Sequence, residues 1–236
     1  MKNSFKTIGI IGGMGSLATA ALFQKVLEHS GALRDAEYPR VFIDNNTTIP
    51  DRTDALIGRG PSPAPALVRS ASGLVSFGAQ ILGMPCNTAH AFLPDIRSVV
   101  DVPFIDMVEE TASMIASEYA ATRVGVLCTS GTRASGLYDV ALAARGLTTI
   151  NVDDLQQDLV MRAIYGAGGI KSGYTTMPRE ILTRACASLN EQGAEIIVLA
   201  CTELPLALSQ SSSHVPLVDT TDVLAKALIR EARILI

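Results

Sequence analysis

The sequence predicts an α/β protein made of two similar, duplicated lobes, each a parallel sheet flanked by helices, with an active site between them. Three observations predict it. Short apolar runs alternate with longer helical segments, which is the pattern of a parallel α/β fold. Of the 236 residues, 48% are apolar and only 18% are charged, as strands buried on both faces require. The third observation is that the chain repeats itself.

Three pairs of segments recur in the same order, at offsets of 116, 115 and 113 residues. The pairs are TIGII at 7–11 with RVGVL at 123–127, GAQILGMPC at 78–86 with GAEIIVLAC at 193–201, and VPFID at 102–106 with VPLVD at 215–219. A period this long indicates an internal duplication rather than a solenoid repeat. Each copy is predicted to run strand, loop, helix, strand, helix, strand and a final short strand.

The repeat also predicts the domain boundaries. The first lobe is expected to comprise residues 1–108 plus 215–236, and the second lobe residues 109–214. A helix from Val108 to about Tyr119 would bridge the lobes. The last helix, Thr220 to Ile236, would return to pack on the first lobe.

Composition and charge exclude several classes of partner. The net charge is −4, Trp is absent and aromatic residues make up 5%, so neither nucleic acid nor an anionic membrane surface is an expected partner. The four cysteines form no CxxC pair and the three histidines lack metal-ligand spacing, so we expect no metal site. Widely spaced cysteines in a chain of this length are typical of reduced thiols in a cytoplasmic protein.

Cys86 and Cys201 occupy equivalent positions in the two copies, each at the end of an apolar strand. In open parallel sheets, ligands bind beyond the carboxyl ends of the strands. A helix beginning after each cysteine would lower the thiol pKa through its N–H groups and dipole. Cys128 and Cys186 are instead expected to be small buried side chains.

Two thiols on opposite faces of one substrate suit inversion at carbon. One cysteine would remove the Cα proton as a base, and the other would return a proton from the opposite side as an acid. Thr132 and Ser130 are the repeat partners of Ser16 and Met14, so they are expected to face the same cleft from the second lobe.

The motifs that carry these residues resemble the aspartate/glutamate racemase family, and within it the aspartate racemases, over nearly the whole chain. They are IGGMG at 11–15, IPDRT at 49–53, MPCNTAH at 84–90, TSGT at 129–132, CTE at 201–203 and VPLVD at 215–219. The resemblance implies two α/β lobes with the site between them, independence from pyridoxal phosphate and metals, and a homodimer.

The resemblance also implies roles for individual residues. Cys86 and Cys201 would be the acid/base pair. Met14, Asn87, Thr88 and Thr202 would line the substrate. Arg52 is similar to the family's carboxylate-binding arginine, and Lys171 to its lysine on the second lobe. Two cations suit a dicarboxylic amino acid, aspartate or possibly glutamate.

Two further residues stand next to the thiols in sequence. Glu203 and His90 would tune the thiol pKa values or orient the substrate ammonium. The alternative is a solvated glutamate at a helix start and a histidine on a helix face.

Other functions stay open on the sequence alone. Residues 13–18, GMGSLA, fit the G-x-G-x-x-A pattern of a dinucleotide site, although the second copy has no such pattern. The same lobes would also suit hydantoin racemisation, maleate isomerisation or malonate decarboxylation. A binding module that holds dicarboxylates without converting them is the alternative outside catalysis, but binding alone does not need paired cysteines.

Overall fold

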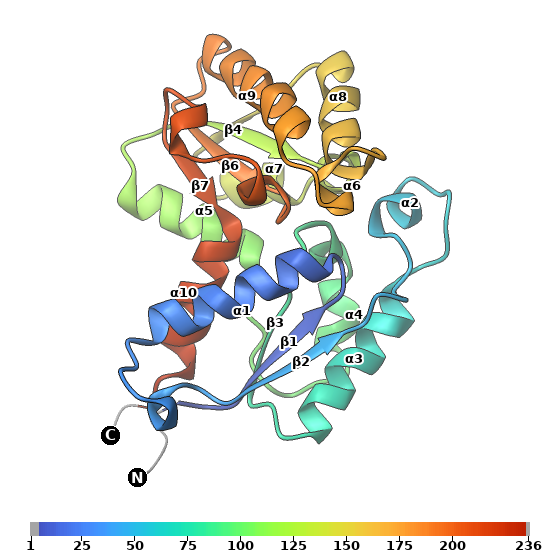
Figure 1. Ribbon diagram of the computed structural model, residues 1–236, viewed down its shortest axis with the longest axis vertical. Helices are drawn as coiled ribbons and strands as arrows, with labels where there is room; N and C mark the ends of the chain where they lie inside the picture. Colours follow the sequence, from blue (N-terminus) through green and yellow to red (C-terminus); the bar gives the residue numbers. More distant parts are fainter. Residues whose placement is uncertain (1–4, 235–236) are drawn as a thin grey trace. The chain divides into compact units, whose positions relative to one another are not determined.

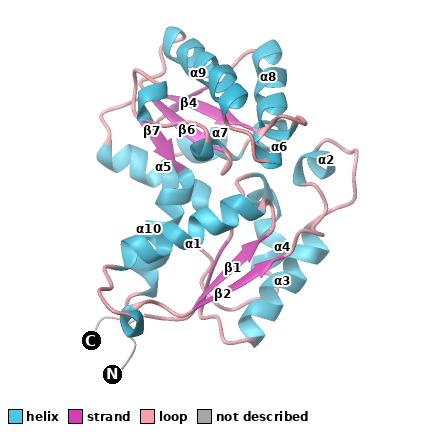
Figure 2. Ribbon diagram, viewed as in Figure 1, coloured by secondary structure: helices cyan, strands magenta, loops and turns pink. Residues whose placement is uncertain are grey.

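A computed structural model describes residues 5–234 of the chain (Figure 1). The chain divides into two compact units. Unit 1 contains the chain up to Glu110 and again from Thr221, and unit 2 is Thr111–Thr220. Each unit has a parallel sheet flanked by helices (Figure 2), so the predicted α/β fold class is confirmed.

Unit 1 is built on a three-stranded sheet of order β2-β1-β3, in which all pairs are parallel. A bridge from Leu82 to Phe104 adds a short parallel segment beside β3. Its elements are β1 (Ile8–Gly12), α1 (Ser16–Ser30), η1 (Asp35–Glu37), β2 (Val41–Asn45), α2 (Arg52–Leu56), α3 (Ala64–Ser76), β3 (Ile81–Gly83), η2 (Thr88–Phe92), α4 (Leu93–Arg97), the start of α5 (Met107–Glu118) and nearly all of α10 (Thr220–Ala232).

Alternation along β1 buries both faces of this sheet. Ile8 and Ile10 pack in one core with side chains of α1 and α10. Ile11 belongs to the core on the other face, which α3 and α4 cover. Gly9 points to that second face, where an added Cβ would lie 2.6 Å from the Leu82 side chain. The central strand therefore carries no charged residue and needs a glycine where α3 approaches.

Unit 2 has a four-stranded parallel sheet of order β5-β4-β6-β7. Its core on one face joins Leu127, Ile197 and Leu199 to the apolar sides of two long helices, α8 and α9. The elements are the rest of α5, β4 (Arg123–Cys128), α6 (Ser130–Ser135), α7 (Leu137–Ala143), β5 (Thr148–Ile150), α8 (Asp154–Tyr165), η3 (Ile170–Ser172), α9 (Thr176–Glu191), β6 (Ile196–Ala200), η4 (Leu204–Leu206), η5 (Gln210–Ser212) and β7 (Leu217–Asp219).

The two sheets have matching strand orders, because the segment at Phe104 occupies in unit 1 the place of β7 in unit 2. The boundary predicted between the second lobe and the returning part of the first lobe was wrong. Residues 215–219 were expected in the first lobe, but β7 pairs with β6 and lies in unit 2. Each copy keeps its own last strand, so the chain returns to unit 1 only with α10.

None of the helices within residues 5–234 is long and apolar enough to cross a membrane.

Candidate active site

The residues predicted for catalysis and substrate binding fall into two groups, one in each unit, and every member except Lys171 is buried. Ser130, which was also expected to face the cleft, is only partly buried at the start of α6. Unit 1 holds Met14, Arg52, Cys86, Asn87 and Thr88, and unit 2 holds Thr132, Lys171, Cys201 and Thr202.

Cys86 lies in a tight turn just beyond the carboxyl end of β3, as the sequence predicted. Its N–H donates to the carbonyl of Met84 at 2.8 Å, and its own carbonyl accepts from Ala89 N–H at 3.2 Å. The chain then continues into the short 3-10 helix η2. The side chain is 6% exposed and packs with the core under α3. The turn fixes the backbone of Cys86 where the strand ends.

His90 holds this turn from the inside of unit 1. Its Nε2 accepts from the backbone N–H of Met107 at 3.1 Å, so Nδ1 carries the proton and donates to the Cys86 carbonyl at 2.9 Å. Burial lowers the pKa of His90, which Asp106 opposes only in part. The imidazole is therefore neutral and holds the backbone of Cys86 from the buried face of η2.

Arg52 is 7% exposed, and its guanidinium donates hydrogen bonds to backbone carbonyl oxygens. One terminal nitrogen donates to the carbonyls of Ile49 and Pro50, at 3.3 and 3.1 Å. The other terminal nitrogen donates to the carbonyl of Met14 at 3.3 Å. The arginine thus ties the loop before α2 to the loop between β1 and α1, in addition to any contact with a substrate.

The glycine-rich loop after β1 has a structural explanation of its own. Gly13 has φ +88°, and an added Cβ would overlap the backbone of Asn46. Its N–H donates to the Thr19 hydroxyl at 3.0 Å, so this amide is already satisfied. Gly13 therefore serves the close approach of two loops, which explains the first glycine of the G-x-G pattern without a nucleotide phosphate.

Cys201 follows directly on β6, and its thiol donates to Oε2 of Glu203 at 3.2 Å. The same oxygen accepts from the hydroxyl of Thr202 at 3.3 Å. Glu203 is only 4% exposed, so this carboxylate is buried beside the thiol. The sequence placed Glu203 next to Cys201 but left open whether it was solvated.

Lys171 supplies the opposite charge. Its ammonium donates to Oε1 of Glu203 at 2.6 Å and lies 5.2 Å from the ring centroid of Tyr165. Ile170 is fully enclosed beside it, and Gly169 makes the turn that leads from α8 into η3. The glycine-rich connection at 166–169 therefore places Lys171 beside Glu203, two residues after Cys201.

The pKa of Cys201 lies well above its ordinary value, chiefly because burial penalises the thiolate and then because of the charge of Glu203. Lys171 and the backbone N–H of Glu203 oppose the increase without cancelling it. The prediction that a helix N-terminus lowers the pKa of this thiol was wrong. Only the short 3-10 helix η4 follows, and desolvation outweighs its N–H groups.

Thr132 is buried at the start of α6, where its backbone N–H donates to the Thr129 hydroxyl at 3.2 Å. The hydroxyls of the two threonines lie 3.1 Å apart. Thr132 is thus part of the N-cap of a six-residue helix.

Cys128 and Cys186 are buried, and burial raises the pKa of each to about 12. Neither thiol has a carboxylate or ammonium hydrogen-bond partner among the described residues, unlike Cys201. Within residues 5–234, no group of His, Cys, Asp and Glu is arranged to hold a metal ion.

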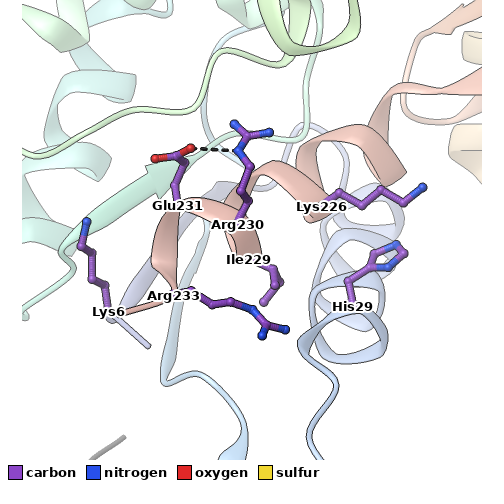
Figure 3. Close-up of a pocket in the computed structure, with 7 residues that line it drawn as sticks. All are labelled: Lys6, His29, Lys226, Ile229, Arg230, Glu231 and Arg233. Carbon is purple, nitrogen blue, oxygen red and sulfur yellow. Dashed lines mark hydrogen bonds and ion pairs between the residues drawn. The ribbon is translucent and has the colours of Figure 1, made fainter. Parts of the chain in front are cut away.

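Two surface pockets of unit 1 lie apart from these residues. One, of about 490 Å³, runs along β2 and α3 beside the exposed Phe77. The other, of about 670 Å³, is mainly cationic (Figure 3). Its Arg230 pairs with Glu110 and Glu231, and its Lys226 with Asp222, so much of the positive charge is compensated. The second pocket is lined by Lys6, His29, Lys226, Ile229, Arg230, Glu231 and Arg233.

The chain is similar in sequence to known racemases. The sequence profile of the Asp/Glu/hydantoin racemase family matches residues 11–228. The chain is 30% identical to the broad specificity amino-acid racemase RacX of Bacillus subtilis, over 94% of this chain and 96% of that protein.

Solved structures show the same likeness. Picrophilus torridus aspartate racemase superposes with a TM-score of 0.86 at 32% identity, covering 98% of this chain and 96% of that one. An aspartate racemase homologue from Pyrococcus horikoshii gives a TM-score of 0.76 at 25% identity, covering 96% and 98%. Since the family profile spans most of the sequence, the chain belongs to the Asp/Glu/hydantoin racemase family, and it is an isomerase of the amino-acid racemase type.

Proposed function

We propose that the protein interconverts L- and D-aspartate by exchanging the proton on Cα, with Cys86 and Cys201 as the acid/base pair. One observation carries this proposal. The two thiols stand just after β3 and β6, the corresponding strands of two sheets with the same order. The proposal requires both thiols to reach one Cα from opposite sides.

The chemistry follows from inversion at a tetrahedral carbon. The thiolate of one cysteine takes the Cα proton, which leaves a planar carbanion. The thiol of the other cysteine then donates its proton to the opposite face, so the enantiomer forms and the two sulfurs have exchanged roles. Neither pyridoxal phosphate nor a metal takes part in the proposed reaction. Asn87, Thr88 and Thr202, together with Met14 and Thr132, are proposed to surround the substrate.

Aspartate is the proposed substrate because of the similarity to the aspartate racemase of P. torridus, which extends over both chains. Arg52 and Lys171 are proposed to meet its two carboxylates. Glutamate is the nearest alternative, since a glutamate racemase from Corynebacterium kroppenstedtii is 32% identical over 62% of the chain.

A broad specificity for amino acids is the second candidate, and one observation favours it. The ammonium of Lys171 lies 2.6 Å from a carboxylate oxygen of Glu203, so part of its charge is already compensated. A site with one compensated cation discriminates less strongly between dicarboxylic and neutral amino acids. The full-length similarity to RacX points the same way.

The test is proton NMR of L-aspartate, L-glutamate and L-alanine with the purified protein in deuterated, reducing buffer that contains EDTA and no pyridoxal phosphate. We expect the Hα signal of aspartate to disappear while D-aspartate accumulates on a chiral column. Equal rates for alanine would favour broad specificity. Absence of exchange with every amino acid would refute the racemase proposal and direct attention to hydantoins, maleate or simple binding.

Cys186→Ala is the matched control for variants that remove the Cys86 or Cys201 thiol, because it removes a buried thiol that the proposal does not use. It should keep the activity of the unmodified protein. The homodimer that the family resemblance implies is also a proposal, and light scattering after size-exclusion chromatography tests it.

A further inference from the structure

We propose that Glu203 and Lys171 govern the proton of Cys201. Glu203 keeps the hydrogen on the sulfur at rest and accepts it when Cys201 has to act as the base. This inference rests on the proposed function for its catalytic half, but its resting-state half concerns the unliganded protein and holds or fails without turnover.

The geometry of the carboxylate carries the argument. Its two oxygens have separate duties, since Oε1 accepts from the Lys171 ammonium at 2.6 Å and Oε2 accepts from the Cys201 thiol at 3.2 Å. The Thr202 hydroxyl donates to the same Oε2 at 3.3 Å. A buried carboxylate needs such partners, and the ammonium is the one that stabilises its charge.

The charged side chains that act on the Cys201 sulfur within unit 2 are those of Glu203 and Lys171. They act in opposite directions, because the carboxylate disfavours a neighbouring thiolate and the ammonium favours it. The carboxylate contacts the Cys201 sulfur directly through Oε2, whereas the Lys171 ammonium contacts the other carboxylate oxygen, Oε1. Burial of the sulfur disfavours the thiolate most, and the carboxylate adds to this effect, so the thiol keeps its proton at rest.

The protons of the reaction can be followed through Cys201, Glu203 and Cys86. The proposed scheme starts with both sulfurs as thiols and Glu203 as a carboxylate. The S–H bond of Cys201 breaks as an O–H bond forms on Oε2, which leaves one thiolate and one thiol. The Cys201 thiolate takes the Cα proton and Cys86 donates its own. Through both directions of the reaction Glu203 retains the proton, so the two sulfurs share one negative charge.

Among the described residues of unit 1, no carboxylate paired with an ammonium contacts the Cys86 thiol. His90 is the nearest counterpart of Glu203, but the imidazole is neutral and donates to the carbonyl of Cys86. We therefore assign control of the proton to the second unit alone, with Glu203 as a positioning residue that acts through Cys201.

The test measures thiolate absorbance near 240 nm as the pH is raised, in three backgrounds: unchanged, Glu203→Gln and Lys171→Met. Each background is paired with its Cys201→Ser derivative, and the difference between the two curves isolates Cys201. Glu203→Gln should move the Cys201 midpoint down and Lys171→Met should move it up, each by about one pH unit or more. Shifts in the same direction, or none, would overturn the proposal.

Circular dichroism at each pH shows whether the variants stay folded. If Glu203→Gln does not fold, Lys171→Met, whose side chain is 21% exposed, still decides the sign of the effect. The same variants then separate the two proposals. If the midpoints move as expected but no amino acid is turned over, the proton control stands and the racemase proposal fails. If turnover occurs and the pH dependence of kcat is the same in Glu203→Gln as in the unchanged protein, the catalytic role of Glu203 is refuted.

Discussion

Replacing His90 by leucine tests whether the imidazole positions Cys86. The ring is 3% exposed and joins two segments of unit 1, because Nδ1–H donates to the Cys86 carbonyl and Nε2 accepts from Met107 N–H. Leucine fills a similar volume but makes neither hydrogen bond. We expect both a loss of stability and a loss of activity from this single change.

The magnitude follows from the two hydrogen bonds. A buried polar group that loses its partner costs about 1–3 kcal/mol. The Cys86 carbonyl keeps the hydrogen bond from Ala89 N–H, so its share is small. The main cost falls on the Met107 N–H, and we expect His90→Leu to lower the free energy of unfolding by about 2 kcal/mol or more. His90→Gln retains one donor and one acceptor and should cost less.

The same residue predicts a pH dependence. Burial lowers the pKa of His90 in the folded protein, so the unfolded chain binds a proton first as the pH falls. His90 therefore costs no stability above its unfolded pKa of about 6.5. Below that value stability is lost, by at most about 1.4 kcal/mol per pH unit, until the folded pKa is reached.

Urea unfolding followed by circular dichroism at pH 8, 6 and 5 measures both effects. The difference between the unchanged protein and His90→Gln should shrink as the pH falls, because the variant lacks the titrating ring. A constant difference would refute the assignment of a neutral buried imidazole. Full racemase activity in His90→Leu would refute its role in positioning Cys86.

Three further predictions concern other parts of the chain. Gly9→Val should lower the stability by about 1–3 kcal/mol in thermal unfolding, since a Cβ at this position overlaps a leucine of β3. Cys128 and Cys186, with pKa values of about 12, should resist iodoacetamide in the native protein at pH 8 and react after denaturation, as mass spectrometry of the peptides will show. Partial burial raises the pKa of Asp222, but hydrogen bonds from its basic neighbours outweigh this and hold it below 3.8, so the stability difference between the unchanged protein and Asp222→Asn should decrease only when the pH falls through that range.

Much of the fold could be predicted because the chain contains two copies of one pattern. A strand that ends in cysteine is ambiguous alone, but its recurrence with the same neighbours predicted two lobes with the same succession of elements, and the two sheets have matching strand orders. The position of VPLVD could not be assigned to a unit in this way. Sequence similarity showed that the segment is a final strand, whereas only the pairing of β7 with β6 shows which sheet it joins.

The positions of the thiols were predictable, but their electrostatics were not. Lys171 and Glu203 are 32 residues apart, and no periodic pattern relates them. Their pairing depends on how the turn after α8 folds back toward the end of β6. The direction of the Cys201 pKa likewise depends on desolvation, which follows from the packing of a whole core. Local sequence shows the N–H groups that lower a pKa but not the burial that raises it.

The duplicated units carry cysteines with different partners, and this difference bears on the proposed reaction. Two enantiomers have the same free energy, so kcat/KM must be equal in both directions for every variant. A difference between the two thiols therefore cannot appear in kcat/KM.

The difference between the thiols appears in hydrogen exchange when one thiol is removed. With Cys201→Ser, only Cys86 can abstract a proton, so one enantiomer of aspartate should exchange its Hα for deuterium with retention of configuration while the other stays protonated. Cys86→Ser should exchange the opposite enantiomer, with Glu203 as the acceptor of the Cys201 proton. Both variants should lose racemisation. If each variant exchanged both enantiomers, a single thiol would serve both faces and the two-cysteine mechanism would be wrong.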